Sequence, residues 1–149
     1  MGLVKMYQIK YTTDINSEIY RDSLNIRTTV FVKEQNVPED IEIDKLEDHC
    51  THFVLYDDQT PMATARFFVT EDNGIHVQRV AVLKEYRQKH LGSKLLKYIF
   101  DFAKKENYQY VILGAQDHAQ MFYTKLGFKV VGKQYKEAGI LHHDMKLEL

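Results

Sequence analysis

The stretch from Val77 to Phe102, V-Q-R-V-A-V-L-K-E-Y-R-Q-K-H-L-G-S-K-L-L-K-Y-I-F-D-F, decides the fold of this chain. It opens with β-branched residues that alternate with small or polar ones, which predicts a strand over residues 77–83. A polar, basic turn follows at residues 84–90. After the turn, apolar residues recur at helical spacing and predict an amphipathic helix that starts near Gly92. The apolar positions of that helix are Leu91, Leu95, Leu96, Ile99, Phe102 and Ala103.

The turn between this strand and this helix is suited to a phosphate group. A chain that turns through residues 87–90 into a helix points several free backbone N–H groups outward, and the helix dipole adds partial positive charge. The turn therefore predicts a phosphate-bearing ligand, most naturally a pyrophosphate. It is not a P-loop, because Gly92-Ser93-Lys94 lacks the upstream glycine and the Gly-Lys-Ser/Thr order.

Composition narrows the class of protein. A length of 149 residues, with 44% hydrophobic and 28% charged residues, predicts one globular domain over residues 1–149. The formal net charge of −1 argues against a nucleic-acid or anionic membrane partner. The single cysteine, Cys50, excludes an internal disulfide framework and fits a reducing compartment. Because there is neither a signal-peptide profile nor an apolar run of about 18 residues, a cytoplasmic protein is predicted.

The chain before the central stretch predicts one strand, one helical region and one loop. Residues 5–12 alternate in polarity and predict a strand. Residues 14–17 offer N-cap side chains for helical structure over residues 16–32, as one helix or two short ones. Residues 33–46 are acidic and contain Pro38, which predicts a loop.

Three strands in a meander are predicted next. Residues 52–56 and 62–69 read as an antiparallel pair joined by the turn-rich residues 57–61. Asn73-Gly74 is a strong hairpin signal and leads into the strand over residues 77–83.

The chain after the amphipathic helix completes a mixed sheet. Residues 110–113 are wholly apolar, as expected of a central strand that is covered on both faces. Asp117 is predicted to cap a helix, with Gln120 as its capping-box partner and Gly127 as the C-terminal signal. Further strands are predicted at residues 128–134 and 143–147, with a turn at residues 136–141. The resulting order, β-α-βββ-α-β-α-ββ, predicts a mixed α/β fold: a central mixed sheet of six to seven strands with helices on both faces.

Two motifs resemble those of the GNAT acetyltransferase superfamily. Residues 87–92 read R-Q-K-H-L-G after the strand Q-R-V-A-V, which resembles the acyl-CoA-binding motif Gln/Arg-x-x-Gly-x-Gly/Ala, with Gly92 as the last glycine and His90 in place of the middle one. Residues 119–128 match A-x-x-F-Y-x-K-L-G-F. The resemblance covers most of the chain and implies the GNAT fold.

Two further segments resemble the small bacterial ElaA/YjcF-like branch of that superfamily. They are V-F-V-K-E-Q at residues 30–35 and E-A-G-I-x-H at residues 137–142. The resemblance implies acetyl-CoA as the acyl donor. It also implies a bulge that splays the strand over residues 77–83 from its neighbour, so that its backbone pairs with the pantetheine arm. The donor-binding residues that it implies are Val80, Ala81, Val82, Arg87, Gln88, Lys89, His90, Leu91, Gly92, Ser93 and Gln116.

The resemblance also implies catalytic residues. Tyr123, in F-Y-x-K-L-G-F, is expected to protonate the departing CoA thiolate, which a phenol with an ordinary pKa of about 10 can do. The group that removes the proton of the amine stays open between several side chains and a chain of waters. The candidates are Glu34, His118 and His142, and beyond them Glu47 and His143.

The predicted function is an N-acetyltransferase that moves the acetyl group of acetyl-CoA to a primary amine, of a small molecule or a peptide, by direct attack. The alternative is a non-catalytic acyl-CoA-binding or regulatory protein of the same fold, which His90 in place of glycine favours. A longer acyl chain is also open, and a homodimer is expected by analogy alone. The acidic side chains of residues 39–48 favour a cationic amine. No metal is predicted, because the spacing of His49-Cys50-Thr51-His52 fits no common zinc pattern.

Overall fold

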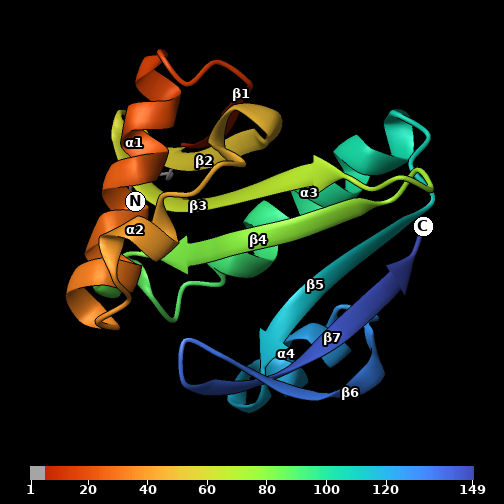
Figure 1. Cartoon of the computed structure of the whole chain (residues 1–149). Helices are drawn as coiled ribbons and strands as arrows, with labels where there is room; N and C mark the ends of the chain where they lie inside the picture. Colours follow the sequence, from red (N-terminus) through yellow and green to blue (C-terminus); the bar gives the residue numbers. More distant parts are fainter. Residues whose placement is uncertain (1–5) are drawn as a thin grey trace.

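The computed structural model describes residues 6–149, which form one seven-stranded sheet in the order β1-β2-β3-β4-β5-β7-β6 (Figure 1). The strands are β1 (Tyr7–Thr12), β2 (Thr51–Asp57), β3 (Thr60–Val69), β4 (Ile75–Val82), β5 (Tyr110–Gln116), β6 (Lys129–Glu137) and β7 (Ile140–Glu148). All neighbouring strands are antiparallel except β4 and β5, which are parallel. The predicted mixed sheet is therefore confirmed, with seven strands. Lys5, part of the predicted first strand, lies outside the described residues.

Helices and helical turns connect the strands. The α-helices are α1 (Glu18–Arg27), α2 (Glu39–Glu42), α3 (Leu91–Lys105) and α4 (Gln120–Lys125). A π-helical segment, η1 (Thr28–Glu34), continues directly from α1. The 3₁₀ turns are η2 (Glu47–His49), η3 (Lys84–Tyr86) and η4 (Asp117–Ala119).

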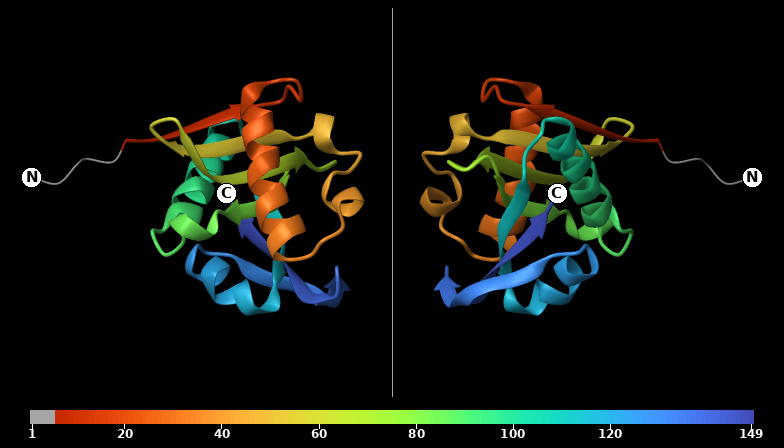
Figure 2. Two further views of the ribbon diagram at one scale, coloured as in Figure 1. Left: turned by 90° about the vertical axis from the view of Figure 1, so that its left-hand side faces the viewer. Right: turned by 90° about the vertical axis from the view of Figure 1, so that its right-hand side faces the viewer.

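Helices cover both faces of the sheet, as predicted (Figure 2). Strand β2 shows how the sequence produces this arrangement. Val54 and Tyr56 pack in a cluster with Ile26 of α1, whereas Phe53 and Leu55 belong to the cluster that contains the buried side of α3. Because successive side chains of a strand point to opposite faces, a run of apolar residues is buried from both sides.

Helix α3 anchors the second face. Its periodic apolar side chains are almost completely buried, and each large one contributes roughly 1.5–3 kcal/mol of burial free energy. The fully buried positions are Leu95, Leu96, Ile99 and Ala103. The helix begins at Leu91, next to the predicted start at Gly92.

The segment between α1 and β2 differs from its prediction. The expected loop over residues 33–46 contains the short helix α2, which directly follows Pro38. Pro38 has φ −58 and stands at the start of this helix, where a proline is well tolerated. Glu39 and Asp40 occupy the first turn, where acidic side chains complement the helix dipole. The loop prediction is wrong here because a proline that ends one helix can also begin the next.

The predicted capping box at Asp117 is also wrong. Helix α4 begins at Gln120, with Ala119 at its cap and no side-chain capping bond. Asp117 instead begins η4, and its carboxylate lies 2.7 Å from His143 Nδ1 and accepts a 2.6 Å hydrogen bond from Gln134 Nε2. The Asp117 side chain therefore joins this turn to β6 and β7.

The last hairpin is tighter than predicted. Strands β6 and β7 extend into the expected turn and leave only Ala138 and Gly139 between them. Both residues have positive φ, 50 and 76, as a two-residue turn of the I′ type requires. This tight turn fixes the register in which Glu137 lies opposite Ile140. Gly127, with φ +101, follows the end of α4 as predicted.

Candidate functional site

Strand β4 carries a bulge in its middle. It pairs with β3 through Gln78 and Arg66 and again through Ala81 and Thr64, so β4 has one residue more than β3 between these pairs. Arg79, at the bulge, has φ 59, a left-handed conformation that a non-glycine residue adopts uncommonly. Such a bulge bends its strand and interrupts the pairing.

Beyond the bulge, β4 and β5 separate. Only three residues of each strand pair, ending at Val77 and Leu113, although both strands continue (Figure 1). The N–H of Leu83 donates to β3 at 3.0 Å. Because backbone groups alternate between the two edges of a strand, those of Val82 and Val80 face the gap on the β5 side. The backbone groups of β4 are thus presented to the gap between the two strands.

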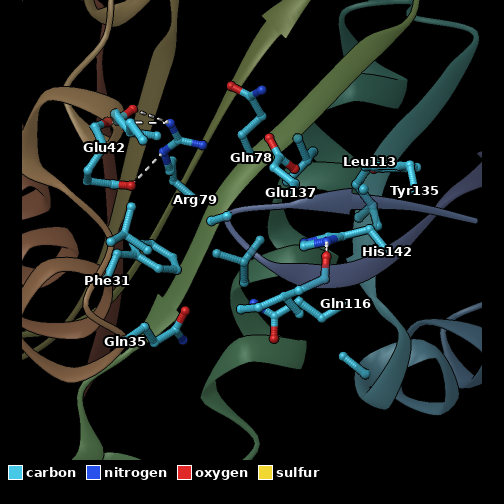
Figure 3. Close-up of a pocket in the computed structure, with 18 of the residues that line it drawn as sticks. Phe31, Gln35, Glu42, Gln78, Arg79, Leu113, Gln116, Tyr135, Glu137 and His142 are labelled. Atoms are coloured by element: carbon cyan, nitrogen blue, oxygen red, sulfur yellow. Dashed lines mark hydrogen bonds and ion pairs between the residues drawn. The ribbon is translucent and has the colours of Figure 1, made fainter.

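A cavity of about 410 Å³ opens at this separation (Figure 3). Its walls come from η1, α2, β4, β5, α4 and the β6–β7 hairpin. Four of the predicted site residues line it: Val80, Gln116, Tyr123 and His142. Gln116 and His142 are also partners in the β5–β7 register.

The turn after β4 adopts the conformation that suits an anion. Gln88 and His90 both have positive φ, 67 and 60, and His90 is the residue that precedes α3. Histidine thus takes the left-handed conformation for which the superfamily motif has glycine. Among the described side chains none caps this end of α3, so its backbone N–H groups remain available to an anionic ligand.

The other predicted donor-binding residues lie around this turn. Leu91 and Ala81 are buried in the core, so only their backbones can contribute to binding. A Cβ atom at Gly92 would lie 3.6 Å from Phe122 and 3.8 Å from Val82, which are ordinary contacts. Packing within the protein therefore does not require this glycine. The ammonium of Lys89 lies 5.9 Å from the ring centre of Tyr86, and Ser93 is half-buried.

Arg87 connects the turn to η1. Its Nη1 and Nη2 atoms lie 2.6 and 2.8 Å from the two carboxylate oxygens of Glu34, and its Nε donates to the carbonyl of Val82 at 2.9 Å. The hydrogen bonds from Arg87 hold the pKa of Glu34 below its usual range. Glu34, predicted as a candidate base, is therefore ionised and paired at the turn, and it is not among the residues that line the cavity.

Tyr123 lies on α4 at the wall of the cavity. Its ring packs against Phe122 and Phe128, with ring centres 5.0 and 5.8 Å away. Burial raises the pKa of Tyr123 to about 12, so the phenol keeps its proton at neutral pH. The side chain can therefore donate a hydrogen bond into the cavity.

His142 is the buried histidine of the cavity, with 7% of its surface exposed. Its Nδ1 atom lies 2.8 Å from the carbonyl oxygen of Ile140. A carbonyl oxygen can only accept, so Nδ1 carries the proton and Nε2 keeps its lone pair in the neutral ring. The imidazole stacks on Tyr135, with ring centres 5.6 Å apart and planes 17° apart. This arrangement leaves a proton acceptor at the cavity wall.

The remaining base candidates lie elsewhere. His118 is exposed on η4 and His143 is bound to Asp117, and neither lines the cavity. Glu47 is buried in an ionic cluster behind the cavity wall. The structure thus brings Tyr123, His142 and Gln116 together and leaves Glu34 and His118 outside.

The ionic cluster consists of three arginines and three carboxylates: Arg27, Arg66, Arg79, Glu42, Asp44 and Glu47. Glu47 is at its centre, with one oxygen 2.7 Å from Arg27 and the other 2.7 Å from Arg66. Burial opposes the ionisation of Glu47, but the hydrogen bonds and charge of Arg27 outweigh it and hold its pKa far below its usual range. Tyr20 adds a 2.8 Å hydrogen bond to the same carboxylate.

This cluster changes the role of the acidic segment over residues 39–48. Glu42, Asp44 and Glu47 are neutralised by arginines and contribute no net charge to the cavity. The other acidic residues of the segment are exposed and do not line the cavity: Glu39, Asp40 and Asp48. The cluster fastens α2 to the bulge of β4, so it shapes the cavity wall rather than supplying a cation site.

Two charged residues of the cavity are absent from the predicted site. Arg79 stands in Q-R-V-A-V, where a charged residue inside an otherwise apolar strand is the available signal. Glu137 opens the segment E-A-G-I-x-H, whose resemblance to the ElaA/YjcF-like branch implies no role for its glutamate. Both residues line the cavity (Figure 3).

The segment with His49 and Cys50 is part of the core rather than a ligand set. Cys50 and His52 are buried, and His52 Nε2 lies 2.8 Å from the carbonyl of Glu47. Within residues 6–149, no three His, Cys, Asp or Glu side chains are grouped so that they could hold a metal ion. In the same part of the chain, every helix is too short or too polar to cross a membrane.

Residues 15–149 match the family model of the acetyltransferase (GNAT) domain. The chain belongs to the GNAT acetyltransferase family. It is 37% identical over 131 residues to the uncharacterized N-acetyltransferase YjcF of Bacillus subtilis, an alignment that covers 87% of this chain and 93% of YjcF. It is 33% identical over 130 residues to protein ElaA of Escherichia coli, which covers 85% of each chain. The resemblance to the ElaA/YjcF-like branch is thereby confirmed.

Solved structures show the same fold. An acyl-CoA N-acyltransferase from Pseudomonas aeruginosa has a TM-score of 0.83 and 28% identity, with 96% of this chain and 99% of that chain covered. ElaA of Escherichia coli has a TM-score of 0.82 and 28% identity, with the same coverage. A GNAT-fold acetyltransferase from Bacillus subtilis, solved in complex with CoA, has a TM-score of 0.70 and 16% identity, with 97% and 99% covered.

Proposed function

We propose that this protein is a single-domain N-acetyltransferase, over residues 1–149, that transfers the acetyl group of acetyl-CoA to a primary amine. One observation carries the proposal: the unpaired edge of β4, the phenol of Tyr123 and the free Nε2 of His142 meet at one cavity. A backbone edge, a proton donor and a proton acceptor are the groups that direct acyl transfer from a thioester needs.

The donor fits the gap between β4 and β5. The backbone groups of Val80 and the N–H of Val82 face this gap and can pair with the amides of a pantetheine arm, while the carbonyl of Val82 already accepts from Arg87 Nε. The turn at residues 87–93 offers the α3 N-terminus to the pyrophosphate, and His90 takes the required left-handed conformation. The CoA complex of the Bacillus subtilis relative supports acetyl-CoA as the donor.

The chemistry is a direct displacement. The amine nitrogen forms a bond to the thioester carbonyl carbon, and the bond from this carbon to sulfur breaks. His142 Nε2 takes the proton that the attacking nitrogen loses. Tyr123 donates a hydrogen bond and then its proton to the sulfur, whose own basicity rises in a buried site, and solvent restores the phenol. The products are an amide and the free CoA thiol.

Removal of the Tyr123 hydroxyl tests the proposal. We expect Tyr123→Phe to lower kcat by roughly 10²-fold, the usual contribution of a positioned acid, while CoA affinity by calorimetry stays unchanged. Release of the CoA thiol over a panel of primary amines is the assay. Tyr98→Phe is the matched control, because Tyr98 is exposed on α3 and lies outside the cavity.

A second pair of variants tests the proton acceptor. His142→Gln is expected to lower kcat by roughly 10²-fold, whereas His118→Gln, which changes an exposed histidine outside the cavity, is expected to have no effect. CoA binding without turnover of any amine, unchanged by Tyr123→Phe, would overturn the proposal in favour of a non-catalytic acyl-CoA-binding protein. Competition between acyl-CoA donors in the same assay measures the preferred acyl chain.

A further inference from the structure

Two carboxylates line the cavity, and they differ in their partners. Glu42 is saturated, because its oxygens lie 2.8 Å from Arg27 Nε and 3.0 Å from Arg79 Nε. The carboxylate of Glu137 makes no hydrogen bond or ion pair with any other residue from 6 to 149. Since the ionic cluster around Glu42 is neutral, Glu137 supplies the uncompensated negative charge of the cavity wall.

The register of the β6–β7 hairpin relates Glu137 to His142. In the β6–β7 hairpin, Tyr135 pairs with His142 and Glu137 pairs with Ile140. Residues two apart on a strand share a face, so Glu137 lies on the face of Tyr135 and about 7 Å further along the hairpin. Figure 3 shows the Glu137 and His142 side chains at the same cavity.

The charge of Glu137 acts inside the cavity. Burial lowers the pKa of His76, another residue of the cavity wall, and the negative charges of Asp144 and Glu137 partly oppose this shift. The exposed carboxylate is therefore within electrostatic range of a half-buried ring in the cavity wall. A cation that enters the cavity would be attracted to it.

Glu137 is unsuited to hold the nitrogen that reacts. A carboxylate paired with an ammonium group keeps that group protonated, and a protonated nitrogen has no lone pair with which to attack. The imidazole of His142, whose Nδ1 is bound to the carbonyl of Ile140 and whose Nε2 has no partner among the described residues, is the better neighbour for the reacting nitrogen. Glu137 is then left to bind a second positive charge on the same molecule.

We infer that the acceptor is a short alkyl diamine, with one amine at His142 and the second, as ammonium, paired with Glu137; this inference rests on the proposed acetyltransferase function. The two positions are one strand repeat of about 7 Å apart along the hairpin, and a chain of roughly four to five methylene groups spans such a repeat. Ile140, Phe31 and Leu113 line the same cavity and offer apolar contacts to such methylene groups.

The decisive experiment compares butane-1,4-diamine with butylamine, which has the same chain but lacks the second charge. For the wild-type protein we expect kcat/KM to be about three- to tenfold higher for the diamine. Glu137→Gln should remove this preference by raising KM for the diamine more than KM for butylamine, with KM for acetyl-CoA unchanged. Glu39→Gln, which neutralises an exposed carboxylate outside the cavity, is the control.

Binding of butane-1,4-diamine to the CoA-loaded protein, measured by calorimetry, separates this inference from the proposed function. If no amine is turned over, the acetyltransferase proposal fails, and the diamine inference is judged by whether Glu137→Gln still weakens diamine binding about three- to tenfold. If amines are turned over but both amines react equally well, or Glu137→Gln leaves the diamine unaffected, the diamine inference is overturned and the enzyme stands.

Discussion

Two arginine–carboxylate pairings lie at the two ends of η1. They consist of the same kinds of side chain but differ in their exposure to solvent. At the start of η1, Arg27 binds Glu42 and Glu47 in the core, with 0% of its side chain exposed. At the end of η1, Glu34 binds Arg87 through two short contacts, with 36% and 37% of the two side chains exposed. The difference shows that burial, not geometry, decides what such a pair does.

The buried pairing has no alternative partners. Its charges have left water, so a missing member would leave an uncompensated charge in the interior. The exposed pairing of Arg87 gains little free energy from its contact, because water screens and competes with it. The guanidinium of Arg87 can therefore release Glu34 and bind a ligand phosphate with little loss of free energy. We propose that the first pairing serves the stability of the fold and that the second serves donor binding.

The largest expected effect follows from breaking the buried pairing at its centre. Glu47→Gln removes the charge that Arg27 and Arg66 share, and we expect it to lower the free energy of unfolding by about 3–5 kcal/mol. Urea denaturation measures this loss. Asp48→Asn is the matched control. Asp48 is adjacent to Glu47 in sequence and forms an exposed pair with His49, so this variant should change the free energy of unfolding by less than about 0.5 kcal/mol. Equal losses in both variants would mean that burial does not separate the two classes.

Acid should weaken the buried pairing in a predictable direction. The pKa of Glu47 is lowered on folding, so its stabilisation is complete above its unfolded value of about 4.3 and is lost as the pH falls below that value. We expect a loss of about 1–2 kcal/mol between pH 5 and pH 3. Thermal unfolding over this range measures it. In Glu47→Gln, stability should fall less steeply as the pH is lowered. An identical dependence on pH would mean that other carboxylates cause the acid sensitivity.

The exposed pairing should respond in ligand binding rather than in stability. Arg87→Ala is expected to weaken CoA binding about tenfold, because a charge-assisted phosphate contact is lost. Its effect on the free energy of unfolding should stay below about 1 kcal/mol. Calorimetric titration with CoA and urea denaturation of the same variant give both numbers. Arg21→Ala, at an exposed position on α1, should change neither.

The smallest effect is expected for the acidic partner of that pairing. Glu34→Gln removes the negative charge that competes with a phosphate for Arg87, so CoA should bind about two- to threefold more tightly. The free energy of unfolding should change by less than about 0.5 kcal/mol. The same titration at low salt measures the change. Weaker binding would instead mean that Glu34 holds Arg87 in the position that the phosphate requires.

The elements that could be predicted from the sequence are those whose signal is local. The periodic leucines of α3, the Asn73-Gly74 turn and the apolar run of β5 each determine their own conformation. The ionic cluster could not be predicted, because its partners lie far apart in sequence: Arg27 is 15 positions from Glu42, and Arg66 is 19 from Glu47. No short spacing rule connects such residues before the sheet is assembled.

The same distinction applies to the site. Tyr123 and the turn before α3 lie in contiguous motifs and could be named from the sequence. The choice among Glu34, His118 and His142 could not be made, because it depends on the pairing of β7 with β5 and on which side chains face the cavity. The left-handed conformation of Arg79 has no sequence signature, so the bulge itself was inferred only from resemblance.

The short contact between β4 and β5 has a consequence for how the molecule is assembled. Strands β1, β2, β3 and β4 form one antiparallel set, in which each strand pairs with the next along the chain. Strands β5, β7 and β6 form a second antiparallel set. Within the sheet, only three residue pairs of β4 and β5 join the two sets. The sheet therefore has a seam, and the two sets are held together mainly by the core cluster that α3 shares with both of them. We expect a donor seated in the gap to bridge that seam from the side that α3 leaves open, so that loading with acetyl-CoA would slow local opening there.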